Sequence, residues 1–205
     1  DYNNDNYPPK YVKNGSSVLE DDDGGYVFIN EHFVQSSSYT YSCLIKVNSE
    51  GEVVWETNHS NGGPSGHFKS NYICKTNDNG YVVTGWNEDT WEAILLKFDS
   101  QGQLEWENFY QSPCCMAYPD QGYSVEQTQD GGYIIAGYAR NTYGPWFMKT
   151  DSQGNMEWEF KLEGNNYLDA GYSGQQTDDS GYIFTGEGRD GLFLLKTDPE
   201  GHYDE

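Results

Sequence analysis

The stretch KTDSQGNMEWEF, Lys149–Phe160, decides the fold because the chain contains it more than once. KFDSQGQLEWEN begins at Lys97, and KVNSEGEVVWET begins at Lys46. A fourth copy, KTDPEGHYDE, begins at Lys196, and the sequence stops before its tryptophan position. Internal repeats of this kind indicate an array of equivalent structural units.

A second repeated motif lies upstream of each of these lysines. It reads DGGY, DNGY, DGGY and DSGY, beginning at Asp23, Asp78, Asp130 and Asp179. The glycine before each tyrosine is 55, 52 and 49 residues from the next one along the chain. Four units of about fifty residues therefore account for the whole chain.

Within one unit the residues favour four short strands, which we name A to D. In the third unit these are YSVEQT (123–128), YIIAGYAR (133–140), PWFMKT (145–150) and NMEWEFKL (155–162). They are rich in β-branched and aromatic residues and are separated by Gly, Asp, Asn and Pro. Segments such as Asp198–Gly201 favour a type I turn that a left-handed glycine closes. The unit is therefore predicted to be antiparallel.

These units predict an all-β fold, a β-propeller with four blades of four antiparallel strands. We expect blades at about 17–66, 67–121, 122–171 and 172–205, preceded by an N-terminal arm at 1–16. Repeated aromatic residues on strands B and D are expected to pack each blade on the next. They are Trp55, Trp106, Trp158, Tyr26, Tyr81, Tyr133 and Tyr182.

The order of these motifs also resembles a known family. D-G-G-Y, an apolar strand ending in Lys, D-x-x-G and a tryptophan strand are similar to the tandem β-propeller repeats of secreted microbial proteins. The resemblance covers nearly the whole chain and implies the propeller fold. It implies little about function, because proteins with such repeats mostly lack an assigned activity.

The charge of the chain excludes several classes of partner. The 205 residues include 11 basic and 33 acidic side chains, a net charge of −22. A polyanion of this kind repels nucleic-acid backbones and acidic membrane surfaces, so we expect neither as a partner. No apolar run approaches the length of a membrane-spanning helix.

Motifs for catalysis and cofactor binding are missing. The sequence has no G-x-S-x-G elbow, H-E-x-x-H, P-loop or G-x-G-x-x-G, and its four histidines are scattered. We therefore predict that the chain is not an enzyme and that it holds no cofactor.

One recurring set of carboxylates is a weak candidate for a metal site. It consists of Asp23, Asp78, Asp130 and Asp179. A ring of these residues near the propeller axis would suit Ca²⁺. Each lies two residues before a glycine, however, so capping of its own hairpin turn is the favoured interpretation. The lysines that end each strand C are expected to pair with such turn aspartates, with little gain in stability at a surface.

Cysteines and glycosylation sequons favour an extracellular, secreted protein. N-x-S sequons stand at Asn14 and Asn58, and the cysteines are even in number. The candidates for disulfides are Cys43, Cys74, Cys114 and Cys115. A vicinal bond between the last two, or separate bonds to the first two, are both open. Cys43 lies in a strand C and is equally compatible with a buried core thiol.

Sequence variation is concentrated in the connections between strands B and C and between strands D and A. These connections share one face of a propeller, and loops on a rigid scaffold are where binding usually occurs. Aromatic residues there are candidates for stacking on sugar rings. They are Trp91, Tyr118, Tyr143 and Tyr167.

The fourth blade lacks strand D and needs a partner for its open edge. We expect the N-terminal arm, from Asn6 to Lys13, to pair near Phe193–Lys196, either within the chain or in another molecule. The favoured function is a non-catalytic extracellular structural module, a filament or surface-layer subunit that self-associates by strand addition through the arm. The alternative is a monomeric glycan- or protein-binding propeller that uses the variable loops.

Overall fold

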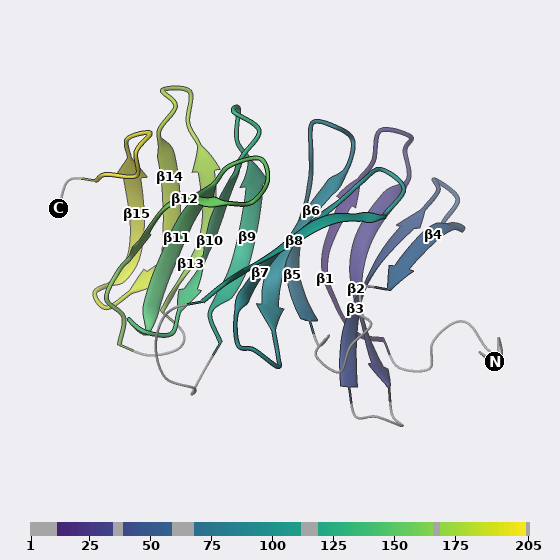
Figure 1. The fold of residues 1–205 in the computed structure, drawn as a ribbon, viewed down its shortest axis with the longest axis horizontal. Helices are drawn as coiled ribbons and strands as arrows, with labels where there is room; N and C mark the ends of the chain where they lie inside the picture. The colour runs from purple at the N-terminus through teal and green to yellow at the C-terminus, as the bar shows by residue number, and fades with distance from the viewer. Residues whose placement is uncertain (1–11, 35–38, 59–67, 112–118, 166–168, 204–205) are drawn as a thin grey trace.

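The computed structural model describes residues 12–34, 39–58, 68–111, 119–165 and 169–203 (Figure 1). Within these ranges the chain forms fifteen strands in four antiparallel sheets, each built from consecutive strands. No helix in the same ranges is long and apolar enough to cross a membrane. The prediction of an all-β chain made of repeated antiparallel blades is confirmed.

The sheets follow the predicted repeats in order. The first contains β1 (Val12–Glu20), β2 (Tyr26–Val34), β3 (Tyr39–Val47) and β4 (Val53–Asn58). The second contains β5 (Phe68–Lys75), β6 (Tyr81–Asn87), β7 (Ala93–Phe98) and β8 (Leu104–Tyr110). The third contains β9 (Gln121–Gln127), β10 (Tyr133–Ala139), β11 (Gly144–Thr150) and β12 (Met156–Lys161). The fourth contains β13 (Ala170–Gln176), β14 (Tyr182–Gly188) and β15 (Gly191–Thr197).

Aspartate and glycine fix the turn between strands C and D, as the sequence predicts. In the third blade, Oδ1 of Asp151 accepts hydrogen bonds from the backbone N–H groups of Gln153 and Asn155, at 2.9 and 2.8 Å. Gly154 has φ of 78°, which an L-residue adopts only with strain. The same geometry recurs at Asp99 and Asp198. The chain therefore reverses direction at the same position in each of these repeats.

Each later blade packs on the preceding blade through its own first strand. β5 contacts β1, β2 and β3; β9 contacts β5, β6 and β7; and β13 contacts β9, β10 and β11. The four blades form a fan in chain order, with the first and fourth blades at opposite ends of the molecule (Figure 1). We call the face of a blade that packs on the following blade its forward face, and the opposite face its rear face.

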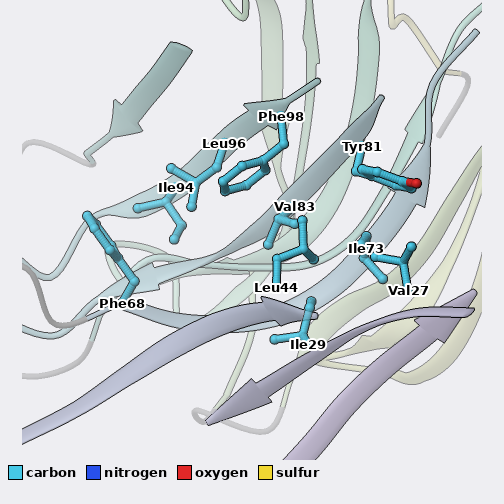
Figure 2. Packing of buried hydrophobic residues seen from close by; sticks show 10 residues of the cluster. All are labelled: Val27, Ile29, Leu44, Phe68, Ile73, Tyr81, Val83, Ile94, Leu96 and Phe98. Atoms are coloured by element: carbon cyan, nitrogen blue, oxygen red, sulfur yellow. The ribbon is translucent and has the colours of Figure 1, made fainter. Parts of the chain in front are cut away.

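Three apolar clusters fill the three junctions between blades. In the first, Val27, Ile29 and Leu44 on the forward face of the first blade meet side chains on the rear face of the second, including Ile73 and Val83 (Figure 2). The other two clusters repeat this arrangement between the second and third blades and between the third and fourth. The core of the protein is thus divided among junctions and does not lie inside any single sheet.

The N-terminal strand corrects one expectation. β1 begins at Val12 and pairs with β2, with Val12 opposite His32. Val12 therefore belongs to the first blade, as does Lys13, which was expected to pair with the fourth blade. The rest of the predicted arm, residues 1–11, lies outside the described residues, and within those residues the fourth blade has three strands.

Candidate functional site

A buried lysine links the turn between strands A and B to strand D in the second and third blades. Nζ of Lys149 lies 2.9 Å from Oδ2 of Asp130 and 2.9 Å from Oε2 of Glu157, and it donates to the carbonyl of Thr150. Lys97 makes the same contacts in the second blade, with Asp78 and Glu105. The predicted pairing of lysine with turn aspartate is confirmed, but its expected position at the surface is wrong for these two lysines, because the next blade buries them.

These contacts occupy the carboxylates that were weak metal candidates. Oδ1 of Asp130 accepts from the N–H of Gly132 at 2.9 Å, and the other three aspartates cap their turns in the same way. Burial opposes the charged form of Asp130, but hydrogen bonds from Thr128 and Lys149 lower its pKa to about 2. In the part of the chain that the structure describes, the only group close enough to share a metal is Asp198, Glu200 and His202, all exposed. The four aspartates are not brought together.

Each strand-D tryptophan is held between two elements of the following blade. Trp106 lies 5.8 Å from Tyr133 between ring centroids, and its ring would be 2.8 Å from a Cβ atom added to Gly154. Trp55 and Trp158 are placed identically, at 5.9 and 5.3 Å from Tyr81 and Tyr182. The predicted role of these aromatic residues in packing between blades is confirmed at all three junctions.

The forward face of the fourth blade has no such cover. Leu192 and Leu194 of β15 are 85% and 74% exposed. Ala93 and Leu95, the residues at the same register in the second blade, are 1% and 0% exposed. These alternate side chains of β15 therefore form an exposed apolar stripe. In the preceding blades the equivalent stripe is buried.

The outer edge of the fourth blade is also open. β15 pairs with β14 and, among the described residues, with no strand on its other side. A hollow of about 410 Å³ lies beside the turns of this blade, lined by Asp179, Lys196, His202 and Tyr203 among others. Lys196 has the repeat's lysine position but is 45% exposed, against 1% for Lys149. A polar hollow thus adjoins the apolar stripe.

The rear face of the first blade is the complementary surface. The predicted packing of Tyr26 between blades is wrong, because Tyr26 is 43% exposed, whereas Tyr81, Tyr133 and Tyr182, at the same position, are buried against the preceding blade. Val18 is 65% exposed, and Ile73, its counterpart in the second blade, is buried. Farther out on this sheet, Cys43 and Ile45 are buried. The exposed part of the rear face therefore lies over β1 and the start of β2.

The first junction carries an ionic cluster. Oδ2 of Asp21 accepts from Nζ of Lys46 at 2.6 Å and from the hydroxyl of Tyr81 at 2.8 Å, while Oδ1 accepts from Nζ of Lys75 at 2.6 Å. Burial opposes the charge of Asp21, but the three donors lower the pKa of its carboxyl far below the usual value. The corresponding residues in the later blades are Thr76, Thr128 and Thr177. This cluster therefore distinguishes the first junction from the others.

The predicted ligand-binding aromatic residues are not brought together by any described contact. The Trp91 ring lies 6.3 Å from that of Trp86, and its carbonyl accepts from the N–H of Asp120 at 3.1 Å. Tyr143 is exposed at a loop position with φ of 52°. Tyr118 and Tyr167 lie outside the described residues.

The structure instead forms a cleft that the sequence did not indicate. It has a volume of about 170 Å³, and its lining includes Phe109, Tyr110, Asp120, Trp146 and Glu159. The indole N–H of Trp146 donates to Oε2 of Glu159 at 2.7 Å. Strands of two blades supply these residues, so no single motif contains them. The one available signal was the tryptophan at a strand-C position that Ile94 and Phe193 occupy elsewhere.

Two of the four candidate cysteines lie within the described residues. Cys43 and Cys74 are both thiols. Cys43 is buried, as its position in strand C indicated; burial, followed by the nearby Glu56, raises the pKa of its thiol. Cys114 and Cys115 lie outside the described residues, as do the side chains of Asn14 and Asn58, so the remaining disulfide and glycosylation predictions are untested.

Comparisons with known proteins identify the fold. No family model matches the chain, and no curated protein matches it significantly. Among solved structures, the chain is similar to the β-propeller domain of the Trilobed protease from Pyrococcus furiosus, which has an open velcro topology. The TM-score is 0.51 at 8% identity, over 91% of this chain and 54% of that one. The chain has a β-propeller fold.

Two further similar structures are longer proteins. One is a protein of unknown function from Bacteroides caccae, with a TM-score of 0.58 at 16% identity over 92% of this chain and 65% of that one. The other is a protein of unknown function from Dyadobacter fermentans, with a TM-score of 0.57 at 12% identity over 86% and 50%. The chain thus spans half to two thirds of the length of these two structures.

Proposed function

We propose that this chain is a non-catalytic extracellular structural module that assembles with further copies of itself through its end blades. The observation that carries the proposal is the exposure of Leu192 and Leu194 on a face that every earlier blade has covered. Burying one leucine side chain is worth about 1.5–3 kcal/mol, and adjacent exposed leucines are typical of interaction surfaces. The open edge of β15 adds unpaired backbone groups to the same surface.

Charge and composition support the other parts of this proposal. The net charge of −22 disfavours nucleic acids and acidic membrane surfaces as partners, and it favours a soluble subunit. The resemblance to tandem repeats of secreted microbial proteins, together with the sequons at Asn14 and Asn58, supports an extracellular location. Catalytic sequence motifs are missing, which favours a structural role.

The N-terminal arm fits an assembly role in length. Residues 1–11 precede β1, and eleven extended residues can span about 36–40 Å. Crossing a sheet of three strands requires about 14 Å. An arm that starts at the first blade of one copy is thus long enough to reach the open edge of β15 on a fourth blade packed against it. Strand addition of this kind would join subunits into a filament or a surface layer.

Light scattering of the purified chain during gel filtration tests the proposal. We expect a mass above that of one chain, and we expect Leu194→Asp to return the mass to that of one chain. Met156→Asp, on an exposed position of a middle blade, is the matched control and should leave the assembly intact. A wild-type chain that elutes as a monomer at every concentration contradicts the proposal.

The cleft beside Trp146 favours a second candidate function, the binding of a glycan. Its lining combines the aromatic rings of Phe109 and Tyr110 with the carboxylates of Asp120 and Glu159, a combination that suits the faces and hydroxyl groups of a sugar. Titration of a panel of soluble neutral oligosaccharides, followed by tryptophan fluorescence, tests it. Binding that persists in Phe109→Ala and Tyr110→Ala would place the glycan elsewhere.

A further inference from the structure

We propose that Arg140 binds the carboxylate group of a small ligand at the end of the third blade where strands B and C connect. Arg140 lies neither in an end blade nor in the lining of the cleft beside Trp146, so the proposal goes beyond both functions proposed above. Its basis is a buried guanidinium that has no carboxylate partner among the described residues of a strongly acidic chain.

The guanidinium of Arg140 is enclosed at its base and open at its tip. The residue as a whole is 5% exposed. Its Nε is buried and has no hydrogen-bond partner, whereas its two terminal nitrogens are not among the buried atoms. A buried charge without a partner is strongly unfavourable, and proteins normally pair it with an opposite charge. The open tip is therefore a place where an anion from outside the chain supplies the partner.

The other cations of the described residues all find carboxylates. Glu88, which has the place of Arg140 in the second blade, pairs with Lys69 at 2.8 Å. Because the chain has 33 acidic and 11 basic side chains, a buried cation without a partner is a specific feature of this position. The lysines with described side chains each have a carboxylate oxygen within 2.9 Å of Nζ; they are Lys46, Lys69, Lys75, Lys97, Lys149, Lys161 and Lys196.

Carboxylates of the chain near this position do not reach the guanidinium. Oδ1 of Asp120 accepts from the backbone N–H of Arg140 at 2.8 Å, but no ion pair joins these two described side chains. Segments 112–118 and 166–168, which lead into and out of the third blade, contain no Asp or Glu. The partner is therefore expected to come from a ligand.

Hydrogen bonds fix the backbone around Arg140. The N–H of Gly164 donates to the carbonyl of Thr142 at 3.1 Å, and the N–H of Leu162 donates to the carbonyl of Pro145 at 2.9 Å. The contact with Asp120 holds the other side of the same loop. A backbone that is already ordered reduces the entropy lost when a ligand binds.

The chemistry of the site selects a carboxylate over other anions. A guanidinium presents parallel N–H donors that match the two oxygens of a carboxylate. Arg140 supplies one positive charge in a chain of net charge −22, and Asp120 is its neighbour, so doubly charged anions are disfavoured. Because only 5% of the residue is exposed, the group that enters must be small. Small monocarboxylates, including sugar acids, meet these requirements.

The two arginines of the chain allow a direct test, because an NMR spectrum of nitrogen-labelled protein shows one Nε–H signal for each. Arg189 has the place of Arg140 in the fourth blade but is exposed, so it is the matched control. Sodium acetate, glucuronate and sulfate are titrated against sodium chloride of equal ionic strength, with glucose as the neutral counterpart of glucuronate. We expect acetate and glucuronate to shift the Arg140 signal to saturation and to leave the Arg189 signal in place.

Variants and thermal unfolding add independent readouts. Arg140→Met should weaken binding by at least about 30-fold, whereas Arg189→Met should bind normally and identifies the Arg140 signal by elimination. Acetate should raise the unfolding temperature of the wild type but not that of Arg140→Met, because a bound ligand stabilises the folded state. If circular dichroism shows that Arg140→Met does not fold, Arg140→Lys replaces it, since lysine keeps the charge but lacks the fork.

The remaining outcomes each decide the question. An Arg140 signal that moves with neither carboxylate overturns the proposal. Equal shifts of both arginine signals, or an equal shift with chloride, also overturn it, because they would show a general effect of salt. Tighter binding of sulfate than of acetate would show that the assignment to a carboxylate is wrong. None of these results bears on assembly, which gel filtration tests separately.

Discussion

Nζ of Lys149 lies 2.9 Å from Oδ2 of Asp130 although nineteen residues separate them in the chain, and the same pair in the fourth blade, Lys196 and Asp179, is 2.8 Å apart. The lysine–aspartate distances are similar, but Lys149 also contacts Glu157, and a following blade covers only the first pair. The two pairs therefore allow a comparison of a buried lysine that holds two carboxylates with an exposed lysine that holds one.

We predict that Lys149→Met destabilises the protein by about 2–4 kcal/mol, since it leaves carboxylates unpaired beside a buried site. Lys196→Met should cost less than about 1 kcal/mol, as for an exposed pair. Urea unfolding of both variants measures the difference. Equal losses would mean that neither the neighbouring blade nor the contact with Glu157 adds to the stability of the pair.

The contribution of Lys149 should also depend on pH. Burial alone would lower the pKa of Lys149, but hydrogen bonds to Asp130 and Glu157 raise it above its ordinary value. A raised pKa stabilises the fold below the unfolded value and loses this effect as pH rises through the folded value. The stability difference between wild type and Lys149→Met should thus be constant near neutral pH and shrink above a pH of about 10.5.

The turn glycines allow a matched test of the tryptophan packing. Gly131 and Gly154 have φ of 84° and 78°, but only Gly154 lies against Trp106 and the Asn108 side chain. Gly131→Ala should cost about 1 kcal/mol from backbone strain alone. Gly154→Ala should cost about 2 kcal/mol more, because its methyl group must displace the indole. Thermal unfolding compares them, and equal costs would show that the tryptophan moves freely aside.

Asp21 should make the first junction sensitive to acid. Asp21→Asn removes the charge that Lys46, Lys75 and Tyr81 share, and it should cost about 2–3 kcal/mol at neutral pH. Because the folded pKa of Asp21 is far below the usual value, its contribution is complete above the unfolded value of about 4 and is lost progressively as pH falls from there through the folded value. Unfolding curves at pH 7 and pH 3 measure this. Glu50→Gln, in an exposed turn, is the control. The difference should be smaller at pH 3 than at pH 7, and a difference that is unchanged at pH 3 would exclude the charge as its cause.

The repeat made the strands, turns and junction aromatics predictable. Asp151 and Gly154 belong to one turn and act within it, so the sequence motif alone is enough to predict the turn. The depth of Lys149 was not predictable in this way, because burial comes from a blade that lies far along the sequence. The open arrangement of the blades was also not predicted from the sequence, because the number of repeats does not determine the rotation between one blade and the next. The cleft was missed because Phe109 and Trp146 belong to different repeats and meet only in three dimensions.

Each sheet in the described residues is built from strands that are adjacent in the chain, and each later blade packs on the blade that precedes it in the sequence. During synthesis on the ribosome, a new blade therefore emerges beside a surface that is already formed. Growth by addition of whole units requires no rearrangement of earlier ones. Gene duplication that inserts or removes one repeat would accordingly change the length of the array and leave the remaining junctions intact.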